Sequence, residues 1–240
     1  MKTGLAPIEP DHPAVRRLSA LAELDDGDRA ALHGAIAKAR SFPVRQELMT
    51  EQQPIRGSML VVSGWAARVR ILPDGRRQFL SFLLPGDLIG MCYHREPLAV
   101  STVVALTAVA VCPIPDDVSE RLDDAFRTSH ALEEAYLLAQ ITRLGRLTAE
   151  ERIGDLLLEF HERLTLASLV IDNSFDVPLT QEALADAVGL TAVHVNRMLQ
   201  QLRRARDLVW KGNRVALSDP AGFAEKVGRT PVRVSARRRP

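Results

Sequence analysis

Residues 179–204, LTQEALADAVGLTAVHVNRMLQQLRR, contain two short stretches of helical periodicity separated by Gly189 and Leu190. Thr180 and Thr191 each precede one stretch, where a hydroxyl can accept a hydrogen bond from a first-turn amide. Gly189 can adopt the positive φ that ends a helix. Apolar residues recur at three- and four-residue spacing, which predicts one shared buried face, made of Leu184, Ala187, Val188, Leu190, Val195, Met198, Leu199 and Leu202. The stretch therefore predicts two packed helices joined by a tight turn, a helix-turn-helix.

The second helix of this pair leaves a polar face with small residues at its start. Small residues permit close approach to the major groove of DNA, and amide and guanidinium groups can pair with base edges there. Residues 208–217 alternate around a Gly-Asn turn, which predicts a two-stranded wing with its tip near the phosphates. A solvated helical hairpin without a ligand is the simpler alternative. We expect DNA contacts from Thr180, Gln181, Thr191, Ala192, Val193, His194, Asn196, Arg197, Gln200, Arg203, Lys211 and Arg214.

Charge is distributed unevenly along the 240-residue chain, whose formal net charge is +1. Residues 179–240 hold 12 Lys and Arg against 5 Asp and Glu, a net charge of +7, which leaves −6 for residues 1–178. A basic end suits double-stranded DNA as a polyanionic partner. The basic residues 229–240 include little that can pack, so we expect a disordered tail there.

Short apolar runs separated by turns dominate residues 42–115, at 59–62, 66–71, 79–83, 103–106 and 109–111. Turns containing Gly64, Gly75 and Gly86 recur at intervals of eleven residues. Regular spacing of this kind indicates a small β-sandwich or roll. Ahead of it, residues 13–39 carry a helical stripe and predict one helix, with Leu18, Leu21, Leu24, Leu32 and Ile36 on its buried side.

Residues 118–164 are helical in pattern and break at Leu147 and Thr148. Thr148 and Glu151 form the sequence of a capping box, which predicts that a new helix begins at Ala149. A heptad-like stripe precedes the break, and such a stripe is either internal core or a seam between two copies. Its residues are Leu132, Tyr136, Leu137, Gln140 and Leu144.

Two motifs together resemble one family. Glycines at 64, 75, 86 and 90 within SGWAARVRILPDGRRQFLSFLLPGDLIG resemble the β-roll of the Crp/Fnr transcription regulators. AVGLTAVHVNRMLQQLR resembles their winged helix-turn-helix, and the two motifs occur in one collinear order over about residues 18–223. The resemblance implies an α+β fold. It divides the chain into an N-terminal helix and double-stranded β-helix (a jelly-roll-like β-roll) sensor domain at 1–115, a dimerisation helix at 116–147, a winged helix-turn-helix at 148–226 and a basic tail at 227–240.

The resemblance also implies a function and partners. It implies a homodimeric, sequence-specific DNA-binding transcription regulator that contacts RNA polymerase and dimerises through the stripe on residues 132–144. Arg197 stands at the family's guanine-reading position. Many relatives have a Glu at the second or third position of the recognition helix, whereas Ala192, Val193 and His194 stand there in this chain. We therefore expect Val193 to contact a thymine methyl and the target half-site to differ from the family's usual one.

The effector residues depart from the family pattern. Cyclic-nucleotide-binding relatives have a Glu after the last roll glycine and an Arg-Ser pair before the next strand, whereas Met91 follows Gly90 here. No charged residue occurs from 97 to 115. A buried phosphate without a cation is costly, so we expect no cyclic-AMP binding of the usual kind. Any effector pocket would involve Met91, Cys92, His94, Ser101 and Thr102.

Cysteine and histidine usage excludes several site types. Cys92 and Cys112 are the two cysteines, too few for an iron-sulfur cluster held by four thiolates. Cys92-Tyr93-His94 repeats a Cys-x-His spacing found in a haem-containing relative, which leaves haem as the weaker alternative to no cofactor. We expect no metal site. No secretory segment begins the chain, and the apolar residues 97–115 read as strands rather than a membrane span, so we expect a cytoplasmic protein.

Two other classes of protein compete with a DNA-binding regulator. A β-roll can hold a catalytic metal, but of the six histidines His94 alone falls in the roll, so we expect no enzyme. The second alternative is a ligand- or haem-sensing protein that acts through protein contacts. The basic helix-turn-helix with its wing favours DNA.

Overall fold

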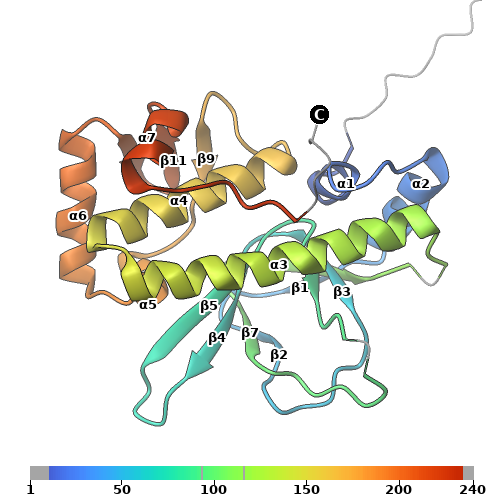
Figure 1. Ribbon diagram of the computed structural model, residues 1–240. Helices are drawn as coiled ribbons and strands as arrows, with labels where there is room; N and C mark the ends of the chain where they lie inside the picture. The colour runs from blue at the N-terminus through green and yellow to red at the C-terminus, as the bar shows by residue number, and fades with distance from the viewer. Residues whose placement is uncertain (1–10, 93, 116, 235–240) are drawn as a thin grey trace, which may run out of the picture.

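One long helix, α3 (Glu120–Arg146), organises the molecule in the computed structural model, which describes residues 11–92, 94–115 and 117–234. The two N-terminal helices lie beside its first half, the β-roll lies along one side of it, and the C-terminal elements gather towards its second half (Figure 1). This arrangement of roll, long helix and C-terminal helix-turn-helix confirms the predicted α+β fold.

The N-terminal segment forms two helices, α1 (Pro13–Ser19) and α2 (Asp26–Ile36), where the sequence predicted one. Asp25 ends the continuity because its side chain accepts a hydrogen bond from the Asp28 amide, while the Asp28 carboxylate accepts one from the Asp25 amide. This capping box begins a new helix in a different direction. Leu18 and Leu32 are nevertheless buried, as the stripe predicted.

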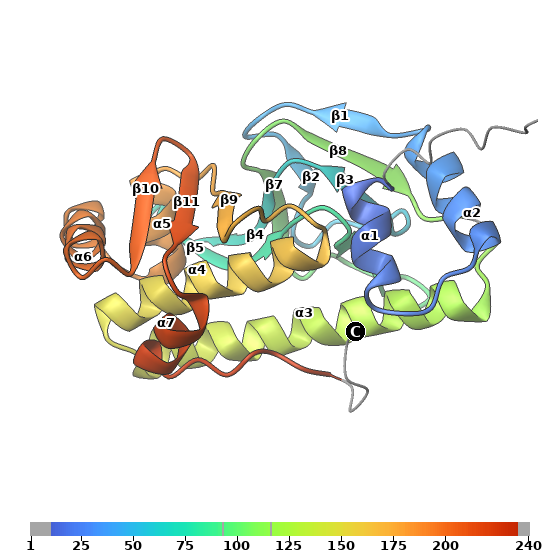
Figure 2. The same ribbon diagram turned by 90° about the horizontal axis from the view of Figure 1, so that it is seen from above.

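The β-roll consists of two four-stranded antiparallel sheets. All five predicted runs form strands, and the structure adds three short strands at Arg40–Phe42, Glu47–Met49 and Leu88–Ile89. Small and branched side chains from both sheets fill the interior. In order, one sheet contains β1 (Arg40–Phe42), β8 (Val109–Pro113), β3 (Met59–Ser63) and β6 (Leu88–Ile89), and the other contains β2 (Glu47–Met49), β7 (Thr102–Ala105), β4 (Ala66–Ile71) and β5 (Arg77–Leu83). Figure 2 shows the roll beside α1.

Gly64 makes the tight corner between β3 and β4. Its φ is +81°, and a Cβ built there would lie 2.1 Å from the carbonyl oxygen of Ala108. The next amide, of Trp65, donates to Thr107 Oγ1 at 2.9 Å. The corner therefore requires both the positive φ and the missing side chain of glycine.

The predicted helix boundary at Thr148 is confirmed. The Thr148 amide donates to Glu151 Oε2 at 2.7 Å, and the Glu151 amide donates to Thr148 Oγ1 at 3.4 Å, which completes the capping box. Helix α4 (Ala149–Leu166) begins there and packs on α3 (Figures 1 and 2). Within the described residues, no helix is both long and apolar enough to span a membrane.

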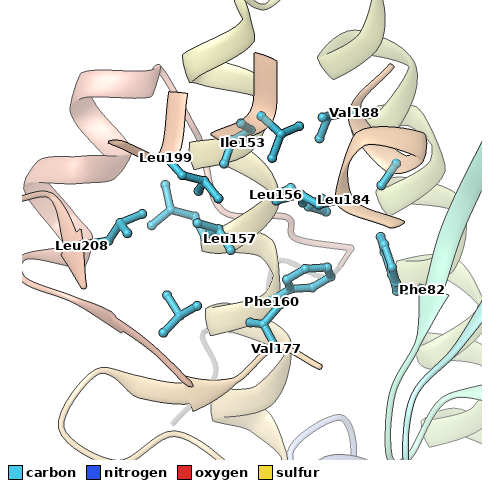
Figure 3. Packing of buried hydrophobic residues seen from close by; sticks show 14 of the residues in the cluster. Phe82, Ile153, Leu156, Leu157, Phe160, Val177, Leu184, Val188, Leu199 and Leu208 are labelled. Atoms are coloured by element: carbon cyan, nitrogen blue, oxygen red, sulfur yellow. The ribbon is translucent and has the colours of Figure 1, made fainter. Parts of the chain in front are cut away.

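The C-terminal domain packs around α4, which supplies Ile153, Leu156, Leu157 and Phe160 to a shared hydrophobic cluster (Figure 3). Phe82 of the roll joins the cluster, with its ring centroid 4.9 Å from that of Phe160. The core of the C-terminal domain is therefore continuous with the outer surface of the roll. The other elements of the domain are β9 (Ser174–Asp176), α5 (Gln181–Val188), α6 (Ala192–Arg204), β10 (Leu208–Lys211), β11 (Arg214–Leu217) and α7 (Pro220–Val227).

The exposed face of α3 coincides only in part with the face that the sequence predicted as a seam. Leu132, Tyr136 and Gln140 are buried within the chain itself, so the assignment of these three to a dimer interface is wrong. The roll and α4 cover them, which periodicity alone does not reveal. Leu137 and Leu144 are half-buried. The large apolar side chains that α3 exposes are instead Leu138 and Ile141, which are 59% and 68% exposed.

Candidate DNA-binding surface

Helices α5 and α6 form the predicted helix-turn-helix. Thr180 Oγ1 accepts from the Ala183 amide at 3.1 Å, and Thr191 Oγ1 accepts from the His194 amide at 3.2 Å. Gly189 ends α5 with a φ of +65°. Each signal is local and confirms the boundary that the sequence predicted.

Helix α6 is strongly two-sided. Val195, Met198, Leu199 and Leu202 are buried against the rest of the domain. The opposite face is open, and Val193 near its start is 82% exposed. Of the residues that we predicted as base-reading, Ala192 and His194 are half-buried, and the exposed ones are Val193, Asn196, Arg197, Gln200 and Arg203. The structure therefore brings the predicted residues of this helix onto one outer face.

Two pairs of polar side chains cross the outer face of α6. Arg197 Nη2 lies 3.1 Å from His194 Nε2, and Gln200 Nε2 donates to Asn196 Oδ1 at 3.4 Å. All four residues were expected to contact DNA, but the sequence did not predict that they pair. Their spacings of three and four residues make such pairs possible in any helix.

The wing is present and has a third strand, β9, that the sequence did not predict. Trp210 Nε1 donates to the carbonyl oxygen of Gly212 at 2.9 Å across the turn, and Arg203 Nη2 donates to that of Trp210 at 3.2 Å. The recognition helix and the wing are thus connected. Lys211 is exposed at the tip. Arg214 forms an ion pair with Asp176, with Nη1 lying 3.4 Å from Oδ1.

A cleft of about 160 Å³ separates α5 and α6 from the wing. Thr180 and Gln181 line it at the N-terminal end of α5, where amide groups and the helix dipole favour an anion. Arg203 and Trp210 line the other side. Helix, wing and cleft form a surface that suits a phosphate backbone beside a groove.

Buried ion pairs connect the C-terminal domain to the roll. Arg163 of α4 donates to Asp87 Oδ2 at 2.6 Å and to the Phe82 carbonyl at 2.8 Å, both in the roll, and to Glu159 Oε1 at 3.0 Å. Its guanidinium carbon lies 4.7 Å from the centroid of the Tyr136 ring on α3. One side chain, 4% exposed, thereby joins three parts of the chain.

Asp87 is shared by two cations. Arg17 Nη2 of α1 lies 2.6 Å from Asp87 Oδ1, on the carboxylate side opposite Arg163. Burial would raise the pKa of Asp87, but the two guanidinium groups outweigh it and hold the pKa below its usual value. Asp87 is therefore a buried anion.

A second part of the network crosses the break between α3 and α4. Arg143 Nε donates to Asp155 Oδ2 at 2.7 Å, and its Nη2 donates to Glu159 Oε2 at 2.6 Å. Its Nη1 also donates to the side chain of Gln140. Because these groups lie on both sides of Leu147 and Thr148, motion at this break requires separating buried charges.

The predicted disordered tail is wrong at Arg229. Its guanidinium donates to Asp155 Oδ1 at 2.8 Å and to Glu162 Oε2 at 2.6 Å, and its side chain is 3% exposed. Arg229 instead joins the buried network of charges on α4. Residues 235–240 of the tail lie outside the described residues.

Side chains of the roll and of α3 also contact α5. Gln78 Nε2 donates to the Asp186 carbonyl at 3.0 Å, and Gln140 Nε2 donates to the Ala187 carbonyl at 2.7 Å. Arg77 Nη2 lies 2.7 Å from Asp186 Oδ2. The helix-turn-helix is consequently held in a defined position relative to the roll.

The predicted effector residues differ in burial. Met91 packs against the cluster of α1 and α2, while Cys92 and His94 are exposed. Ser101 and Thr102 are buried, and Thr102 Oγ1 accepts from the Glu51 amide at 3.1 Å. Among the residues described, no group of three or more His, Cys, Asp or Glu side chains is arranged to hold a metal ion.

A small cavity lies between the roll and α3. It is lined in part by Ser81, Ser129, Tyr136 and Arg163, and its volume is about 10 Å³, which is room for one water molecule. Burial raises the pKa of Tyr136 to about 12, so its hydroxyl stays protonated. None of the five predicted effector residues lines this cavity.

Comparison with known proteins assigns the family. Residues 39–124 match the model of the cyclic nucleotide-binding domain, and residues 151–226 match that of the Crp-like helix-turn-helix domain. The chain belongs to the Crp/Fnr family. The relatives of this Crp/Fnr protein are transcription regulators, which agrees with the prediction that it is not an enzyme.

Curated relatives cover nearly all of this Crp/Fnr protein. The transcriptional activatory protein AadR of Rhodopseudomonas palustris is 29% identical over 220 residues, covering 88% of this chain and 90% of AadR. The nitrogen fixation regulation protein FixK of Bradyrhizobium diazoefficiens is 27% identical and covers 92% of this chain and 97% of FixK. The solved structure of FixK2 from Bradyrhizobium japonicum has a TM-score of 0.68 and 25% identity, covering 78% of this chain and 95% of that one.

Proposed function

We propose that this protein is a homodimeric, cytoplasmic transcription activator that reads a palindromic DNA site with α6 of each protomer. The observation that carries the proposal is the open face of α6, with Arg197 exposed beside a basic wing in a domain of the Crp-like type. Relatives described as activators support the direction of regulation. An activator of this kind would contact RNA polymerase.

Two copies are required for the proposed recognition. One recognition helix contacts only a few base pairs, and a pair held at fixed spacing multiplies the discrimination. A two-fold symmetric dimer places its half-sites about one helical turn apart, roughly 34–36 Å. We therefore expect an inverted repeat with this spacing.

The exposed stripe of α3 supports a dimer seam. Leu138 and Ile141 are three residues apart and face outward, with the half-buried Leu137 and Leu144 beside them and the exposed Gly145 one turn beyond Ile141. Apolar residues so exposed on a helix of 27 residues are typical of a helix that packs on a symmetric copy.

Lysine at both Leu138 and Ile141 should convert the dimer into monomers. The substitution places four like charges across the two-fold axis and removes apolar contact area. Light scattering at micromolar concentration measures the mass directly. Ile171→Lys is the control, because Ile171 is 65% exposed but lies outside α3, in an isolated bridge with Ser174. A double variant that stays dimeric would show that the seam lies elsewhere.

We further propose that the roll binds no cyclic nucleotide in the family's usual manner. Met91, in place of the usual Glu, lies against the cluster of α1 and α2. Residues 97–115 offer no cation to a cyclic phosphate, and the cavity between roll and α3 has room for one water molecule. An uncharged ligand, a carboxylate ligand or no ligand are the alternatives that fit these observations.

Selection of bound DNA from a random pool by the purified protein tests the proposed function. Wild-type protein should enrich an inverted repeat. Arg197→Ala should weaken binding to that repeat by about 1–3 kcal/mol per half-site, about fivefold to 150-fold, because a bidentate guanine contact is lost. Lys211→Ala should weaken all sequences alike and reduce the salt slope by about 1 per protomer.

Gel-shift titrations on selected and random DNA separate these two roles. Failure of wild-type protein to enrich any sequence would contradict DNA recognition as the function. If Arg197→Ala lost selected and random DNA equally, Arg197 would be a phosphate contact and not a base-reading residue.

A further inference from the structure

We propose that His194 is a positioning residue that orients Arg197 for base reading. The inference rests on the proposed function, since it concerns how the recognition helix becomes selective. It starts from the 3.1 Å contact between His194 Nε2 and Arg197 Nη2 on the outer face of α6.

His194 is more constrained than Arg197. Its amide donates to Thr191 Oγ1 at 3.2 Å, which fixes it in the first turn of α6, and its residue is half-buried. Arg197 lies one turn later on the same face and is exposed. A long arginine side chain loses much rotamer freedom when it binds, and a contact that orders it beforehand reduces this cost.

The two nitrogens of the His194 ring have different roles in this contact. A guanidinium group has donors and no acceptor, so Nε2 must accept and the proton of the neutral imidazole lies on Nδ1. One of the five N–H groups of Arg197 is used by His194. The others remain available for the paired O6 and N7 acceptors of guanine.

Arg197 differs from three other cations of this domain, which contact carboxylates. Arg214 contacts Asp176, Lys226 contacts Asp207, and Arg229 contacts Asp155 and Glu162. Within the described part of the chain, Arg197 makes no ion pair with a carboxylate. A carboxylate would cancel the charge and compete with DNA acceptors, whereas a neutral imidazole orients the guanidinium and leaves its charge available.

A double-mutant cycle on DNA tests the assignment. The four proteins are wild type, His194→Ala, Arg197→Ala and the double variant, each titrated with the selected inverted repeat and with random DNA. His194→Ala should weaken binding to the repeat about tenfold, about 1.4 kcal/mol, with little change on random DNA. In the Arg197→Ala background the same change should have no further effect.

Rescue by a conservative variant separates positioning from packing. His194→Gln supplies a carbonyl oxygen that can accept from Arg197, so it should restore most of the affinity, whereas His194→Leu should behave like His194→Ala. Gln201→Ala, an exposed change on the same helix, should leave binding unchanged. Thermal unfolding of each variant verifies the fold.

The outcomes are distinguishable. Equal binding by the Ala, Leu and Gln variants, or a loss from His194→Ala that persists without Arg197, overturns the positioning role and leaves DNA recognition intact. If wild-type protein enriches no sequence, the proposed function fails and this inference fails with it.

Discussion

Replacing Arg163 with Ala should lower the free energy of unfolding by about 3–5 kcal/mol, which is a large part of the roughly 5–15 kcal/mol that holds a typical protein together. The change leaves Asp87 and Glu159 as buried carboxylates with fewer cations beside them. An exposed ion pair contributes only about 0–1 kcal/mol, so burial decides the size of this effect. It also removes the hydrogen bond to the Phe82 carbonyl, a direct connection between α4 and the roll.

Urea unfolding followed by tryptophan fluorescence measures this change, because Trp65 packs with its ring centroid 4.8 Å from that of Phe160 at the same interface. Arg163→Met, which keeps most of the side-chain volume, separates the loss of charge from the loss of packing. Arg204→Ala is the control, since Arg204 is exposed on α6 and should change stability by less than about 0.5 kcal/mol. A loss below about 1 kcal/mol for Arg163→Ala would contradict the structural role of the network.

Gly64→Ala should destabilise the roll by more than about 4 kcal/mol, a size that point substitutions rarely reach. Two effects add at this corner. A non-glycine residue at a φ of +81° is strained, and its Cβ would lie 2.1 Å from the Ala108 carbonyl oxygen and 2.9 Å from the Cα of Val109. Both contacts are with backbone, so the strands themselves must move.

Gly75→Ala provides the matched comparison. Gly75 has a φ of +85°, close to that of Gly64, but nothing lies within 4 Å of a Cβ built there. It should cost only the backbone strain, about 1–2 kcal/mol. Thermal unfolding and soluble yield compare the two variants. Equal effects of the two substitutions would show that the contact with Ala108 is relieved at little cost.

Local signals account for the features that were predicted correctly. The caps of α4, α5 and α6 and the turn at Gly189 depend on residues within four positions of one another, so the sequence contains all the partners. The strands of the roll follow from turn spacing in the same way. The single helix predicted for the N-terminal segment is wrong although the relevant signal is local. The capping box at Asp25 and Asp28 is visible in the sequence and outweighs the continuous helical stripe.

The residues predicted for the dimer seam show a limit of sequence periodicity. Helix α3 has apolar residues on more than one side, and the spacing of Leu132 and Tyr136 is as regular as that of Leu138 and Ile141. Only the packing of the roll and α4 decides which of the two sides is covered. The candidate DNA surface was easier to predict, because amphipathic α6 has a single buried side.

The sequence by itself therefore determined the helix-turn-helix, its wing, the roll and the family, since each depends on short-range pattern. The tertiary structure alone decided which charges are buried and paired. Asp87 and Arg163 are 76 residues apart, and Arg229 is 74 residues from Asp155. No local rule relates such positions. A charge can remain in a protein interior only where the fold brings an opposite charge to it, and that is a property of the whole chain.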